Sequence, residues 1–135
     1  MSVFDTSSFV SAAFRLGRLP DLALRHAFRT DDLAVSEPVL AELIDVMHRP
    51  GLACFIDPDQ RSEFLDLLHR LGTMFTPATP VTDCRDDKDN MVLELAFAAE
   101  ARLIVASDKD LLVLHPWRTV QIVSPATYLA QACPP

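Results

Sequence analysis

Acidic side chains occur where strands end and helices begin, and their positions suggest metal chemistry. Asp5 directly follows the apolar run Ser2–Phe4, and Asp108 directly follows the run LIVAS. Asp89 stands where a long apolar helix is predicted to begin, and Glu42 lies at the margin of another helix's apolar stripe. Carboxylates held together raise one another's pKa unless a cation neutralises them. The pattern therefore predicts a hard divalent metal, Mg²⁺ or Mn²⁺ rather than Zn²⁺, because the ligands are oxygens only.

Each acid also has a purely structural interpretation. Asp5 can cap a helix that starts near Ser8, and Asp110 can favour a helix N-terminus by its charge. Glu42 can be an ordinary boundary glutamate. Apart from Asp89, the acids around CRDDKDN are expected to be solvated loop charges or caps. If the acids do share a metal, they repel one another without it, so asparagine at Asp5 or Asp89 should stabilise the metal-free protein.

Short apolar runs alternate with helical patterns, which is typical of an α/β domain with a parallel sheet. Five strands with helical crossovers predict a three-layer α/β/α sandwich, whose ligands usually lie beyond the carboxyl ends of the strands. The predicted strands are Ser2–Phe4, Leu33–Val35, Met74–Thr76, Leu103–Ala106 and Val120–Val123. The main predicted helices are Ser8–Phe14, one opened by Pro20, one from Ser36 to His48, one from Pro58 to Gly72, Asp89–Ala101 and a short one from Pro125.

The composition fits one domain of ordinary size, with half of the 135 residues apolar. We expect a single domain over 1–130 and a C-terminal tail over 131–135. No apolar run is long enough to cross a membrane and no signal peptide is evident, so a cytoplasmic protein is expected. The three cysteines are far apart and lack metal-ligand spacing. The net charge of -7 either serves solubility or reflects carboxylates gathered around a cation.

Taken together, the motifs resemble the PIN-domain family, especially its VapC-like bacterial toxins. The matching segments are VFDTSSFVSA, SEPVLAELIDVMHRP, CRDDKDNMVLELAFAAEARLIVASDKDLLVL and VQIVSPATYL. The resemblance implies a five-stranded sheet in the order 3-2-1-4-5 and an acidic site that binds Mg²⁺ or Mn²⁺. It also implies cleavage of RNA, a cognate antitoxin and a homodimer. The family's acids fall on Asp5, Glu42, Asp89 and Asp108, with Asp110 as an extra acid.

The chain departs from the family's usual pattern at three places. Ser7 stands where the family often has asparagine, so a contact to the site is lost or made through water. Asp87 stands where a proline is common. Ala106 and Ser107 replace a frequent Thr-Gly or Ser-Gly pair, although the Ser107 hydroxyl can still orient Asp108.

The resulting hypothesis is a metal-dependent endoribonuclease, the toxin of a toxin–antitoxin pair, with the alternative of a non-catalytic PIN-fold binding module. A phosphatase of the haloacid-dehalogenase type would need a second aspartate at Ser7, and a nucleotide-binding enzyme would need a glycine-rich loop. Cations are needed near the cleft to bind RNA. The candidates are Arg15, Arg18, Lys88 and Lys109.

Overall fold

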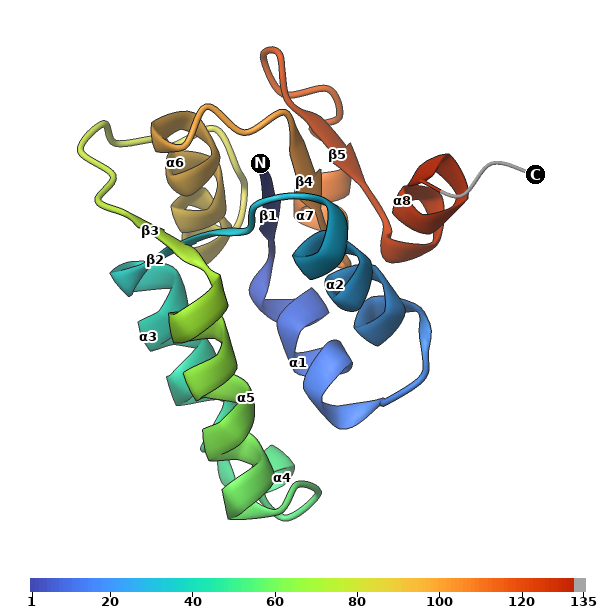
Figure 1. Cartoon of the computed structure of the whole chain (residues 1–135). Helices are drawn as coiled ribbons and strands as arrows, with labels where there is room; N and C mark the ends of the chain where they lie inside the picture. The colour runs from blue at the N-terminus through green and yellow to red at the C-terminus, as the bar shows by residue number, and fades with distance from the viewer. Residues whose placement is uncertain (133–135) are drawn as a thin grey trace.

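A computed structural model of the chain describes residues 1–132 and shows an α/β domain with short parallel strands (Figure 1). The strands are β1 (Ser2–Phe4), β2 (Ala34–Ser36), β3 (Thr73–Phe75), β4 (Leu103–Val105) and β5 (Gln121–Val123). The helices are α1 (Thr6–Phe14), α2 (Leu19–Thr30), α3 (Glu37–Met47), α4 (Pro50–Ala53), α5 (Pro58–Leu71), the 3₁₀ turn η1 (Asp87–Asp89), α6 (Asn90–Ala98), α7 (Lys109–Leu112) and α8 (Pro125–Ala132).

The strands form two parallel sheets, β1-β4-β5 and β2-β3. Phe4 pairs with Val105 at the carboxyl ends of β1 and β4, so these two ends lie side by side. A single parallel bridge between Ser2 and Leu33 links the sheets, and the Ser2 amide donates to the carbonyl of Asp32 at 2.9 Å. Because this contact stops at the first residue of β1, the described residues do not form one continuous five-stranded sheet in the order 3-2-1-4-5.

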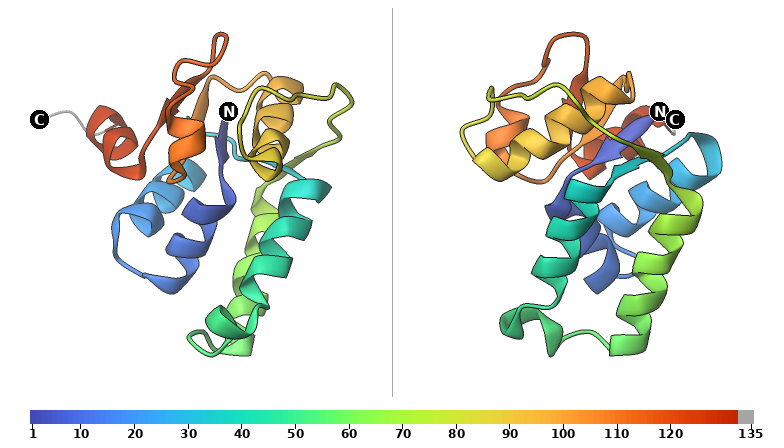
Figure 2. Two further views of the ribbon diagram at one scale, coloured as in Figure 1. Left: turned by 180° about the vertical axis from the view of Figure 1, so that it is seen from behind. Right: turned by 90° about the vertical axis from the view of Figure 1, so that its left-hand side faces the viewer.

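Helices cover both faces of β1. Helix α6 packs against β1 and β2, while α1 packs against α2, and α2 against α8. In the right-hand view of Figure 2, β1 lies between α6 on one side and α2 on the other. Helices α3 and α5 project in one direction from β2 and β3, with α4 at their far end.

The core is built from apolar side chains of the strands and of the helix faces turned toward them. The largest fully buried ones are Val3, Phe4, Phe9, Leu33, Leu40, Leu43, Met47, Leu68, Leu93, Leu95, Ile104 and Leu111. They come from β1, β4 and five of the helices, with Leu33 just before β2. Buried Ala34 and Val35 of β2 belong to the same cluster, so one core joins the two sheets.

Local capping explains where the predicted helices begin and end. The Ser36 hydroxyl accepts from the Val39 amide at 3.3 Å and starts α3, and Asp57 accepts from the Asp59 amide at 2.9 Å beside Pro58. Gly72 ends α5 at a close approach, because a Cβ there would lie 2.6 Å from the Leu68 carbonyl oxygen and 2.8 Å from Val35 Cγ2. The short helix α4 was not predicted, because Pro50 and Gly51 directly after the predicted helix are residues that commonly follow a helix end.

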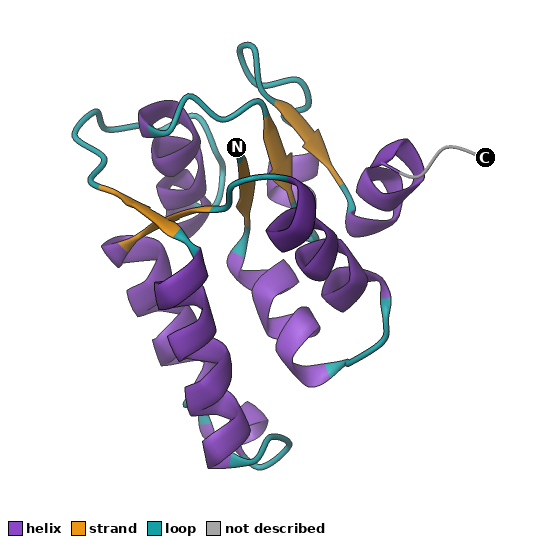
Figure 3. Ribbon diagram, viewed as in Figure 1, coloured by secondary structure: helices purple, strands orange, loops and turns teal. Residues whose placement is uncertain are grey.

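A long loop connects β3 to η1 and α6 (Figure 3). Its last residues carry part of the candidate site. At the other end of the chain, α8 includes Gln131 and Ala132, the first residues of the expected tail 131–135. Residues 133–135, with Cys133, lie outside the described part. Of the two described cysteines, Cys84 is buried and Cys54 is exposed.

Candidate active site

The site begins at the adjacent carboxyl ends of β1 and β4. Asp5 follows β1 directly, and its amide donates to the Val105 carbonyl at 3.0 Å, which extends the β1–β4 pairing by one residue. After Val105 the chain turns through Ala106 and Ser107 to Asp108, the N-cap of α7. The parallel pairing therefore brings Asp5 and Asp108 to the same edge of the sheet, as the sequence predicted.

Asp5 is buried, and both of its carboxylate oxygens accept hydrogen bonds from backbone amides. Only 1% of its surface is exposed. One oxygen accepts from the Ser8 amide at 2.7 Å, and the other accepts from the amides of Ser107 and Asp108 at 3.0 and 3.1 Å. Burial raises the pKa of Asp5, and these hydrogen bonds act in the opposite direction. Asp5 therefore caps α1 and also fixes the backbone that carries Asp108.

Two serine hydroxyls form a further contact between α1 and the β4–α7 turn. The Ser8 and Ser107 hydroxyl oxygens lie 2.9 Å apart, so one donates to the other across the gap between α1 and the β4–α7 turn. Asp108 in turn accepts from the Asp110 amide at 2.8 Å. The turn is thus held from β1, from α1 and from within α7.

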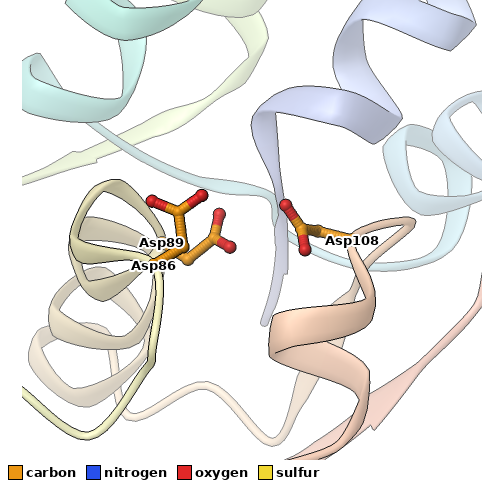
Figure 4. Close-up of side chains that lie close together, drawn as sticks. All are labelled: Asp86, Asp89 and Asp108. Atoms are coloured by element: carbon orange, nitrogen blue, oxygen red, sulfur yellow. The ribbon is translucent and has the colours of Figure 1, made fainter.

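The second side of the site comes from η1. Asp86 caps this turn by accepting from the Lys88 amide at 3.1 Å, and Asp89 ends it. Carboxylate oxygens of Asp86, Asp89 and Asp108 all lie within 4.8 Å of one another. Figure 4 shows Asp86 and Asp89 reaching from one side toward Asp108 on the other. We call these three residues the acidic cluster.

Asp89 is the unsatisfied member of the acidic cluster. Its Oδ2 atom is buried and has no hydrogen-bond partner among the residues that the structure describes. Burial, followed by the negative charges of Asp108 and Asp86, raises the pKa of Asp89 to about 7. A buried carboxylate oxygen without a donor is costly, and a bound cation or a proton removes that cost.

A pocket of about 480 Å³ opens over the acidic cluster. Helix α1 contributes the hydroxyls of Thr6, Ser7 and Ser11 to its lining, and α3 contributes Glu42. The remaining lining residues are Val10, Val46, Arg49, Leu52, Asp86, Lys88, Asp89 and Asp108. The pocket therefore combines carboxylates, hydroxyls and two cations at the position where an α/β fold usually binds its ligand.

Comparison with known proteins places this arrangement in a family. The family model described as "PIN domain" matches residues 2–110. This chain belongs to the PIN domain family. A curated relative is 27% identical over 115 residues, which cover 84% of this chain and 74% of the relative. It is "Uncharacterized protein MJ1680" of Methanocaldococcus jannaschii, whose name states no activity.

The PIN domain match spans all the acids predicted from the sequence, and the structure gives them different surroundings. Asp89 and Asp108 meet in the acidic cluster, with Asp5 behind the backbone of Asp108. Glu42 lines the same pocket but lies beside cations, with Lys88 Nζ 3.6 Å from its carboxylate. Asp110 does not line the pocket, and its amide donates to the carboxylate of Asp108, the N-cap of α7.

The supporting serines of this PIN domain are also placed. Ser7 lines the pocket from α1. Ser107 is exposed, donates its amide to Asp5, and shares a hydroxyl contact with Ser8 rather than with Asp108. The predicted hydroxyl bond from Ser107 to Asp108 is thus replaced by an indirect connection through Asp5.

Sequence reasoning missed two residues that shape the site. Asp86 was grouped with the solvated or capping acids, and it is both a cap and a member of the acidic cluster. Its spacing of three residues from Asp89 was the available signal, because one helical turn brings such residues together. Asn90 is buried and pins the loop through the backbone of Cys84, and a lone asparagine gives no such signal.

The basic residues predicted to bind RNA do not all lie at the same pocket. Lys88 lines the pocket, whereas Arg15 and Arg18 line a neighbouring hollow that shares only Ser11 with it. Lys109 is exposed and lines neither hollow. Among residues 1–132, no helix is long and apolar enough to span a membrane.

Proposed function

We propose that this PIN domain protein is a metal-dependent endoribonuclease. The observation that carries the proposal is the acidic cluster, in which Asp89 has a buried Oδ2 without a hydrogen-bond partner among residues 1–132. PIN domains are commonly nucleases, their nuclease members use divalent metals, and they act on RNA.

The residues present fit a hard divalent cation. All donors in the acidic cluster are carboxylate oxygens, which suit Mg²⁺ or Mn²⁺ and not a thiolate-preferring metal. Asp89 and Asp108 would hold the ion together with Asp86, and Asp5 would support Asp108 from behind. Direct contact with the metal is proposed neither for Glu42, which lies beside cations, nor for Asp110, which lies outside the pocket lining.

A bound divalent cation would lower the pKa of a bound water and offset negative charge on the phosphate in the transition state. The chain supplies the positions of the groups around it. Asp5 fixes the Asp108 backbone through two amide hydrogen bonds, so Asp108 needs little rearrangement to act. The hydroxyls of Thr6, Ser7 and Ser11 line the pocket and can donate to phosphate oxygens or the 2′-hydroxyl of RNA.

Within this function we propose the role of a toxin that forms a homodimer and is inhibited by a small antitoxin. The support is the sequence resemblance and the exposure of several large apolar side chains. Phe55 is 76% exposed, Leu16 68% and Val113 76%, whereas Phe9 is fully buried in the core. Light scattering at high concentration tests the dimer, and a strictly monomeric protein would contradict it.

Cleavage of a labelled single-stranded RNA tests the enzymatic proposal. We expect the wild type to cleave internally with Mg²⁺ or Mn²⁺ and not with chelator. Asp108→Asn should nearly abolish cleavage, and Asp87→Asn, which removes an exposed charge from η1 outside the acidic cluster, should not. Near-normal cleavage by a pure, folded Asp108→Asn protein would contradict the assignment.

The non-catalytic alternative predicts a different result from the same assay. A PIN-fold binding module would bind RNA or a protein partner without metal-dependent cleavage. In that case neither the metal nor Asp108 would change the integrity of the RNA.

A further inference from the structure

Two basic side chains line the pocket over the acidic cluster, and the proposed function leaves their role open. Of the described residues that line it, Lys88 and Arg49 are the basic ones. Lys88 comes from η1, and Arg49 is the N-cap of α4. Both reach Glu42 of α3, with their charged atoms within 4.0 Å of its carboxylate.

Glu42 is surrounded by positive charge. Its side chain is 18% exposed, with Lys88 Nζ at 3.6 Å and Arg49 Nη2 at 4.0 Å from the same carboxylate oxygen. Arg49 is also held by Asp45, one turn back from it on α3, at 3.0 Å. Glu42 is therefore placed to hold the side chains of Lys88 and Arg49 at the edge of the site.

Both basic side chains can take a further contact while they remain beside Glu42. The Lys88 side chain is 60% exposed and that of Arg49 is 49% exposed, so both charged ends reach solvent. Exposed pairs of this kind contribute little to stability. A phosphate group offers Arg49 two oxygens in the geometry that a guanidinium prefers, and offers Lys88 a full negative charge.

The overall charge of the protein makes such local cations necessary. A protein with net charge -7 repels a polyanion at a distance, and the acidic cluster adds to this in the pocket. Binding an RNA strand there requires positive groups next to the cluster, since phosphate contacts dominate nucleic-acid affinity. In the described pocket lining, only Lys88 and Arg49 meet this requirement.

We propose that Lys88 and Arg49 bind backbone phosphates of the RNA strand beside the bond to be cleaved, and that Glu42 is the positioning residue that holds both cations there. This inference rests on the proposed ribonuclease function. It assigns Glu42 to substrate binding rather than to the metal, which departs from the role that the sequence resemblance implies.

Single-turnover cleavage of a labelled single-stranded RNA in Mn²⁺, with enzyme in excess over a range of concentrations, separates binding from the cleavage rate. Lys88→Met and Arg49→Met should each raise the half-saturating enzyme concentration roughly threefold or more. Each should also reduce the slope of log affinity against log salt by about 0.7, the value of one contact to single-stranded nucleic acid. Lys88→Arg should restore both. The control is Arg29→Met, which removes an exposed charge from the last turn of α2, outside the pocket.

Mn²⁺ binding by calorimetry, without RNA, gives the second readout. Glu42→Gln should raise the half-saturating concentration as the cation variants do, while Mn²⁺ affinity stays within about threefold of the wild type. A tenfold loss of Mn²⁺ affinity in Glu42→Gln would instead assign Glu42 to the metal and overturn its positioning role.

The two proposals fail in different ways. In one outcome the wild type cleaves RNA, but the RNA affinity and salt slope of Lys88→Met and Arg49→Met equal those of the wild type or change no more than those of Arg29→Met. The phosphate role is then wrong, and the ribonuclease assignment stands. If the wild type neither binds nor cleaves RNA, both are wrong.

Discussion

Asp5 and Asp89 are the same residue type at one site, and their hydrogen-bonding environments are opposite. Asp5 accepts from the amides of Ser8, Ser107 and Asp108, whereas Oδ2 of Asp89 is buried without a partner in the described part of the chain. A metal-free protein can stabilise the first carboxylate by its own backbone but not the second. The two residues should therefore respond differently to neutralisation.

The stability of the metal-free protein should depend on the titration of Asp89. Its pKa is about 7 in the folded protein, above its ordinary value of about 3.9. The folded state therefore favours the protonated form, so the contribution of Asp89 to stability is complete below about 3.9 and is lost as the pH rises through about 7. Thermal melts with chelator should show a gain in stability from pH 8 to pH 6 that is smaller in Asp89→Asn.

At pH 8 the Asp89→Asn protein should be more stable than the metal-free wild type by something like 1 kcal/mol, as is common where a functional site is strained. Asp87→Asn is the matched control, because it removes a charge from the same turn outside the acidic cluster. Equal pH profiles for wild type, Asp89→Asn and Asp87→Asn would show that the cluster does not repel.

Asp5→Asn should destabilise the metal-free protein, in contrast to the expectation from sequence alone. Asparagine places an NH₂ group where Asp5 has an oxygen, so either the Ser8 amide or those of Ser107 and Asp108 lose their acceptor. A buried amide left without an acceptor costs about 1–3 kcal/mol. Urea unfolding of the chelated protein checks this, and a stabilised Asp5→Asn protein would mean that relief of the buried charge is the larger effect.

At the scale of the elements, the loop before α6 is held in place by side-chain hydrogen bonds. Asn90 is buried, accepts from the Cys84 amide at 2.8 Å and donates to the Cys84 carbonyl at 3.4 Å. Farther back, Asp83 accepts from the indole of Trp117 at 2.8 Å. These contacts tie the segment that carries Asp86 and Asp89 to the rest of the domain.

Asn90→Ala should therefore affect both stability and the acidic cluster. Removing the carboxamide leaves the Cys84 amide without its acceptor, which should cost about 1–3 kcal/mol in urea unfolding. Because the loop is then less constrained, Mn²⁺ affinity measured by calorimetry should fall as well. An Asn90→Ala protein that loses stability but binds Mn²⁺ like the wild type would show that the loop keeps its geometry without this side chain.

The sequence predicted most elements because their boundaries depend on local chemistry. Ser36 starts α3 through the Val39 amide, and the Gly72 amide ends α5 on the Leu68 carbonyl. The edge residues of β1 and β4 follow from apolar runs. The break between the two sheets was not predictable in this way. It depends on how far pairing extends from the single Ser2–Leu33 bridge, which involves residues distant in sequence.

The same distinction holds for the site. Asp5 and Asp108 could be predicted because parallel strand ends must meet at one edge of a sheet. The contact of Lys88 with Glu42 could not, since it brings η1 beside α3. Arg49 lies at helical spacing from Glu42 and Asp45, a signal that the sequence interpretation did not use. Ion pairs between distant elements leave no periodic signal in the sequence.

At the scale of the whole molecule, an acidic chain carries the site that we propose binds a polyanion. The net charge is -7, yet one pocket gathers the acidic cluster and the cations Lys88 and Arg49. A divalent cation bound by the cluster would reverse the local field and make the pocket attractive to phosphate. Metal binding is therefore the step on which the whole account depends.

Calorimetric titration of the chelator-treated protein with Mn²⁺ tests this claim most directly. The wild type and Asp87→Asn should bind with similar affinity, and Asp89→Asn and Asp108→Asn should bind at least about tenfold more weakly, as expected when a ligand of a metal site is lost. Mn²⁺ should also raise the melting temperature of the first two proteins and do much less for the others. Equal Mn²⁺ binding by all four proteins, or none by the wild type, would contradict the account.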